Sequence, residues 1–60
     1  MRGMAFTIRA WHAWLEERAP YVFAGEAKTN RHAFRMVAWL QAQGLRVRVT
    51  GPDGKPATKE

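Results

Sequence analysis

The residues of this sequence whose type and spacing could do chemistry are arginines that occur in two regular pairs. Arg31 and Arg35 are four residues apart, one turn of a helix, and Arg46 and Arg48 alternate with apolar residues as on one face of a strand. Each pair could contact two phosphates of a nucleic acid backbone, and Lys55 lies in the turn that follows the second pair. The alternative interpretation is that all five are the solvated sides of amphipathic elements.

Trp39 raises a second question about binding. It follows Arg35 by four residues and lies outside the apolar arc expected for the same helix, next to Leu40. Three interpretations stay open: a cation–π pair with Arg35, a residue presented to a partner, or a core residue packed against an earlier helix. If the partner is single-stranded nucleic acid, Trp39 could stack on a base.

Catalysis is not expected from these residue types. The chain has no Ser and no Cys, so the common nucleophiles are absent, and it has no Gly-rich phosphate loop. Its two histidines, His12 and His32, are twenty positions apart with no Cys near them, an improbable metal site. We therefore expect a protein that binds rather than catalyses, without cofactor or metal.

Composition sets the limits of the fold and the class of partner. Sixty residues make one domain at most, and 47% hydrophobic residues are typical of a globular chain. Without disulfides, so small a chain depends on a good core or on self-association into a homo-oligomer. The formal net charge of +5 favours anionic partners, either nucleic acid or an acidic protein surface. Because no apolar run could span a membrane, we expect a cytoplasmic protein that does not associate with membranes.

The elements that must position these residues follow from hydrophobic periodicity. Residues 8–19 predict an amphipathic helix, whereas a strand over the same residues has no clean face. The apolar side of this helix consists of Ile8, Trp11, Trp14 and Leu15. Residues 21–24 are a short run of strand-favouring residues, which predicts a brief strand.

The second half of the chain has a clearer pattern. A second helix is expected from Thr29 or Asn30, both good N-caps, to Gln43, with Gly44 positioned to end it. Residues 45–50 alternate strictly between apolar and polar side chains, which indicates a half-buried strand.

These elements predict a small α+β domain in which two amphipathic helices pack on a short two- or three-stranded sheet. The domain is expected over residues 1–52, and residues 53–60 are expected to form a turn and a mobile tail. If the strands at 21–24 and 45–50 pair directly, they run parallel with the second helix as a right-handed crossover.

Residues 34–56, FRMVAWLQAQGLRVRVTGPDGKP, resemble the end of a winged-helix domain. The shared features are a helix ending in Gly, an alternating basic strand, and a Gly/Asp turn in the place of the wing. The resemblance covers about a third of the chain and implies a winged-helix-like fold as an alternative. A helix-turn-helix also needs a short preceding helix, for which residues 21–28 leave little room.

Two functions remain open from sequence. The first is a small nucleic-acid-binding protein, such as a dimeric regulator, that binds through the basic helix face and strand. The second is a protein-interaction module, such as a small inhibitor or adaptor, that docks on an acidic protein surface through Trp39 and the neighbouring arginines.

Overall fold

The computed structural model describes residues 5–15 and 21–59 of the chain. Within these residues it is a compact α+β fold with three strands and one helix. In chain order the elements are β1 (Phe6–His12), β2 (Phe23–Ala27), α1 (Asn30–Ala42) and β3 (Leu45–Thr50).

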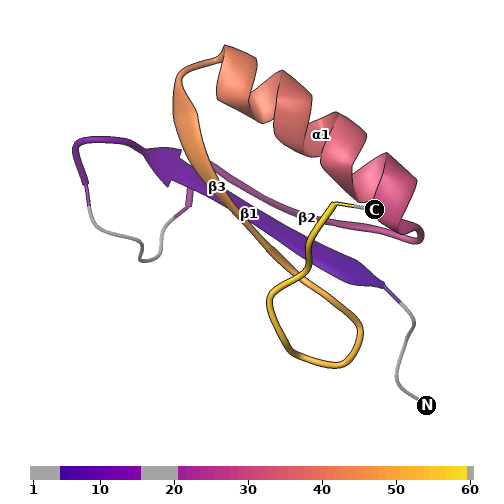
Figure 1. Cartoon of the computed structure of the whole chain (residues 1–60). Helices are drawn as coiled ribbons and strands as arrows, with labels where there is room; N and C mark the ends of the chain where they lie inside the picture. The colour runs from indigo at the N-terminus through magenta and orange to yellow at the C-terminus, as the bar shows by residue number, and fades with distance from the viewer. Residues whose placement is uncertain (1–4, 16–20, 60) are drawn as a thin grey trace.

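The three strands form an antiparallel sheet in the order β2-β1-β3, so the first strand is the central one. Ile8 of β1 lies opposite Gly25 of β2 and Val49 of β3. Figure 1 shows α1 lying along one face of this sheet. The part of the chain that the structure describes therefore has two layers, a helix and a sheet with one open face.

The core lies between α1 and the sheet and follows the alternation of the strands. Successive side chains of a strand point to opposite faces, so Ile8 and Ala10 of β1 point toward α1 while Arg9 between them points away. Ile8 and Leu40 are the largest side chains that are fully buried. The buried core residues are Ile8, Ala10, Ala27, Ala33, Leu40 and Val49.

The predicted helix over residues 8–19 is wrong. Residues 6–12 form the central strand instead, because their alternation directs Ile8 and Ala10 into the core while the backbone pairs with β2 at one edge and β3 at the other. The predicted helix over residues 8–19 combined part of this strand with the turn that begins at Ala13, which hid the alternation. Residues 16–19 of the predicted helix lie outside the described residues.

The second predicted helix is confirmed as α1. Thr29 is its N-cap, and the side-chain hydroxyl of Thr29 accepts a hydrogen bond of 3.0 Å from the backbone N–H of His32. Gly44 follows the C-cap with φ of 83°, the left-handed conformation in which glycine avoids the strain of a side chain. The cap and the glycine fix where α1 begins and where β3 can start.

The strand predicted at 21–24 is present but shifted, since β2 runs from Phe23 to Ala27 and continues through Gly25. An ideal Cβ at Gly25 would lie 2.9 Å from Cζ of Phe23, so the Phe23 ring occupies the space above this glycine. A glycine that sequence patterns treat as a boundary is thus part of the sheet.

The expected parallel pairing of the two later strands does not occur, because β1 lies between β2 and β3 and pairs with both. The strand β3 itself is confirmed at residues 45–50. The segment before α1 is strand β2 rather than a helix, so the described residues lack the helix-turn-helix of the winged-helix alternative.

The segment after β3 returns along the sheet to the start of α1 (Figure 1). The N–H of Ala57 donates to the carbonyl oxygen of Val49 at 2.9 Å, and Pro56 forms an isolated bridge with Thr50. The side-chain amide of Asn30 donates to the main-chain carbonyl of Thr58 at 2.9 Å. These contacts place the segment beside the outer edge of β3.

Burial of Ile8 predicts the effect of removing a single methylene from the core. Ile8→Val should lower the free energy of unfolding by about 0.5–1.5 kcal/mol, measured by urea denaturation. Leu15→Val removes the same group from a side chain that is 50% exposed and should change stability much less. Equal effects of the two substitutions would contradict the placement of Ile8.

The N-cap predicts a second effect on stability. Thr29→Ala should cost about 1 kcal/mol in urea denaturation, because the N–H of His32 loses its hydroxyl acceptor. Thr29→Ser keeps the acceptor and should retain the stability. A Ser variant as unstable as the Ala variant would show that the cap does not hold the start of α1.

Candidate functional site

The face of the sheet that α1 leaves open carries three arginines. Arg9 lies on the central strand directly opposite Arg48 of β3, and Trp11 lies opposite Arg46 of β3. All three arginines are exposed and Trp11 is half-buried. The strand alternation thus places a basic and aromatic surface across β1 and β3.

Tyr21 adds a second ring to this surface. The guanidinium carbon of Arg9 lies 5.5 Å from the centroid of the Tyr21 ring, within the range of a cation–π contact. The rings of Trp11 and Tyr21 meet edge to face with centroids 6.5 Å apart and an interplanar angle of 64°. The segment leading into β2 therefore carries its aromatic ring onto the same face. We call the surface formed by Arg9, Trp11, Tyr21, Arg46 and Arg48 the open-face cluster.

The electrostatics of the open-face cluster favour an anion. Arg9 and Arg48 are direct cross-strand neighbours, and like charges in that position destabilise a sheet. Glu26, the acidic residue that β2 places on this face, lies opposite Thr7, two positions along the sheet from the pair of Ala24 and Arg9. A phosphate group bound between Arg9 and Arg48 would accept a charge-assisted contact from each.

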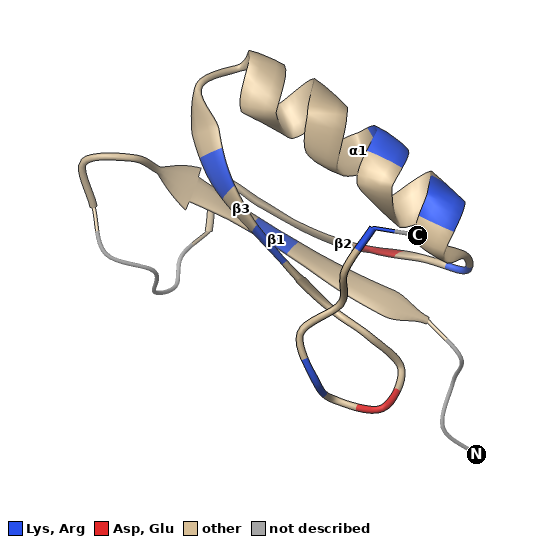
Figure 2. Cartoon of the chain, in the orientation of Figure 1, with Lys and Arg blue, Asp and Glu red and all other residues tan. Residues whose placement is uncertain are grey.

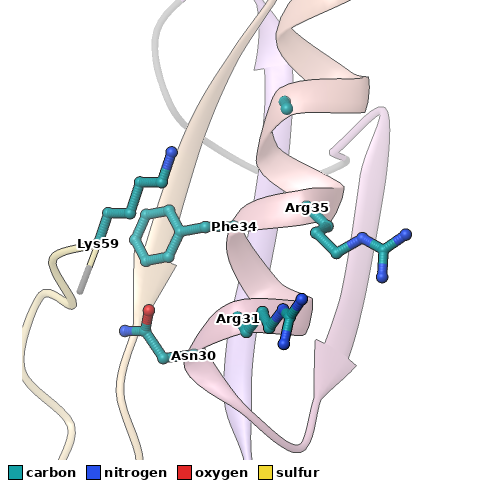
Figure 3. A pocket seen from close by; sticks show the side chains of 6 residues that line it. Asn30, Arg31, Phe34, Arg35 and Lys59 are labelled. Carbon is teal, nitrogen blue, oxygen red and sulfur yellow. The ribbon is translucent and has the colours of Figure 1, made fainter.

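A second basic surface lies on the helix layer (Figure 2). Arg31 and Arg35 are exposed on α1, and together with Phe34 and Lys59 they line a hollow of about 470 Å³. Figure 3 shows the Phe34 ring directed toward Lys59, while Arg31 and Arg35 extend from the other side of the helix. These two arginines share a helix face, as their spacing predicts.

Trp39 is on the surface of the helix layer, with 62% of its area exposed. The interpretation that it is a core residue packed against an earlier helix is therefore wrong. It lies near the edge strand β2, where it lines two adjoining hollows with Phe23 and Leu40. Trp39 is thus a surface aromatic, separated by the sheet from the open-face cluster.

The structure divides the residues that sequence analysis grouped into one binding surface. Arg46 and Arg48 lie on the open face of the sheet, whereas Arg31, Arg35 and Trp39 lie on α1, across the other face. The remaining member, Lys55, follows the turn after β3, where its backbone N–H donates to a carboxylate oxygen of Asp53 at 3.0 Å.

Sequence analysis missed Arg9, Trp11 and Tyr21. The first two were assigned to a helix that does not exist, and Tyr21 was treated only as part of a short strand. The signal that could have found them is the alternation of residues 6–12 taken alone, which places Thr7, Arg9 and Trp11 on one side.

The described residues contain no group of three or more His, Cys, Asp or Glu side chains that could hold a metal ion. Among the same residues no helix is long and apolar enough to cross a membrane. Comparisons with protein-family models, with curated proteins and with solved structures gave no match.

Proposed function

We propose that this protein is a non-enzymatic binder of single-stranded nucleic acid and that the open-face cluster is its binding surface. The observation that carries the proposal is that three exposed arginines and two aromatic rings share one face of the sheet. Arginine supplies phosphate contacts, and aromatic side chains supply platforms on which bases stack. The combination is typical of proteins that bind unpaired strands.

Single strands fit this surface better than a duplex. The bases of a duplex are stacked on one another, so the face of a three-stranded sheet, which is wider than a groove, could reach mainly its phosphates. In a single strand the bases are free to turn toward Trp11 and Tyr21 while the backbone follows the arginines. The net charge of +5 would speed the encounter with either form.

The helix layer is the weaker location for nucleic acid. It offers Arg31, Arg35 and Lys59, but the ring in their hollow, Phe34, is half-buried and directed toward the C-terminal segment (Figure 3). Trp39, the exposed ring of this layer, lies beside β2 and not beside Lys59. The alternative function, docking on an acidic protein surface, would use this layer.

The proposal predicts how affinity depends on salt. A labelled pyrimidine-rich single strand should bind with an affinity that falls as salt rises, because neutralised phosphates release counterions. Three phosphate contacts give a slope of about −2 for the logarithm of the association constant against the logarithm of the salt concentration. Fluorescence anisotropy from low to physiological salt measures this slope. Binding that is indifferent to salt, or no binding at low salt, would refute the proposal.

A matched pair of arginine variants locates the surface. Arg46→Ala should weaken binding about tenfold and reduce the slope by about 0.7, since it removes one phosphate contact from the open face. Arg31→Ala removes an exposed arginine from the other layer and should leave both values nearly unchanged. If Arg31→Ala causes the larger loss, the helix layer is the binding surface and the open-face cluster is not.

A further inference from the structure

The edge strand β2 and the helix beside it form a continuous groove with no described chain in it. Three adjoining hollows of about 400, 390 and 320 Å³ follow this edge. The first and second share His32, and the second and third share Phe23, Trp39 and Leu40. We call this the β2 groove. Its residues from the helix are His32, Arg35, Met36, Trp39, Leu40 and Gln43.

We infer that the β2 groove is an interface between two copies of this chain, which pair their β2 strands antiparallel about a two-fold axis at Gly25. Among the described strands, β2 pairs with β1 alone, so its other edge is placed to accept another strand. The opposite edge of the sheet differs, because Pro56 and Ala57 bond to β3 there.

The sequence of β2 suits pairing with itself. Edge strands that avoid association carry Pro, a bulge or charged residues, Lys above all, and β2, which reads FAGEA, has no Pro or Lys and a single charge, Glu26. Centred on Gly25, the pairing places Glu26 opposite Ala24 of the second copy, so the two carboxylates are not opposed. It also places Phe23 opposite Ala27, a large residue against a small one.

The side chains above β2 supply the apolar part of such an interface. Trp39 is 62% exposed and Val22 is 50% exposed, and both line the β2 groove. A tryptophan is among the residues that contribute most when an interface buries them. A standard protein–protein interface buries about 800 Å² of solvent-accessible surface on each partner. That is roughly a sixth of the 4692 Å² of accessible surface of this chain.

The size of the core gives a reason for a second copy rather than another occupant. Among the described residues, three of the six buried core residues, Ala10, Ala27 and Ala33, are alanines, and most of the larger side chains packed against them are only partly buried. Domains this small gain stability from disulfides, metals or association. The chain has no cysteine, and its described residues offer no metal cluster, which leaves association.

Charge gives this dimer a salt dependence opposite to that of nucleic-acid binding. Each copy carries a formal charge of +5, and Arg35 of each copy would lie near the two-fold axis. Added salt screens both repulsions and should tighten the dimer. The two copies would join their open faces into one six-stranded sheet, with both helices on the other side.

Sedimentation velocity over a range of protein and salt concentrations tests the inference. The parent chain should shift from the mass of one chain toward twice that mass as either concentration rises. Trp39→Ala should raise the dissociation constant at least about tenfold, because it removes the exposed ring of the interface. Gln41→Ala, an exposed change on the same helix outside the groove, is the control. A single-chain mass under all conditions, or equal constants for the two variants, would overturn the inference.

Charge changes at Ala24 test the strand pairing itself. Ala24→Lys places a cation opposite Glu26 of the second copy and should tighten the dimer, whereas Ala24→Glu should weaken it. Because Ala24 also lies opposite Arg9 of its own chain, both changes are repeated with Glu26→Gln, which removes only the contact between copies. Two symmetric cross-strand pairs correspond to about 2- to 30-fold in each direction. Circular dichroism confirms that both variants remain folded. Equal constants for the two variants, or shifts in the reverse order, would overturn the pairing about Gly25.

Discussion

The alternation of side chains along β1 is the constraint on which the rest of the structure depends. As the central strand, β1 forms backbone hydrogen bonds with a neighbour at each edge, so its register is fixed. Each of its side chains therefore points either to the core or to the open face. Ile8 and Ala10 hold α1 to the sheet, and the residues between and after them, Arg9 and Trp11, are thereby fixed on the other side. A shift of one residue would bury Arg9 and expose Ile8. The same pattern that makes the core therefore makes the open-face cluster.

The open edge of β2 and the open face of the sheet are the parts of the sheet that α1 does not cover. Within the described residues, this helix of thirteen residues covers one side of three strands, and it packs more against β3 and β1 than against β2. The uncovered parts are the arginine and aromatic face and the β2 groove, which differ in chemistry. The face is cationic and suits phosphates. The groove is mainly apolar beside a strand edge and suits another strand. The two proposed binding events would therefore use different residues of this domain.

The sequence predicted the second half of the fold better than the first half. The limits of α1 and β3 follow from local signals, an N-cap at Thr29, a glycine at 44 and strict alternation after it, which need no knowledge of the rest of the chain. The identity of β1 depended on which residues were taken together. Over residues 6–12 the apolar side chains alternate with the period of a strand. When residues up to 19 are included, the apolar positions fit the period of a helix better than that of a strand. The pairing order could not follow from spacing either, since β1 separates the two later strands.

The candidate site was predicted in part for the same reason. Arg46 and Arg48 were placed on one strand face, as the structure has them, and Arg31 and Arg35 on one helix face. Whether the helix face and the strand face point to the same side of the molecule depends on the tertiary structure. The structure shows that they point to opposite sides, because α1 covers the other face of the sheet. Arg9 and Trp11 join Arg46 and Arg48 through cross-strand pairing, and Tyr21 joins them through its ring contacts with Arg9 and Trp11. No local pattern encodes these contacts.

The measurement that tests the central claim most directly is a chemical-shift titration of the isotopically labelled protein with a short pyrimidine single strand. If the open face binds, the largest changes should fall on backbone and side-chain signals of Arg9, Trp11, Arg46 and Arg48, with the signals of Arg31 and Arg35 little changed. Changes that gather on α1 instead, or an absence of changes at low salt, would contradict the account.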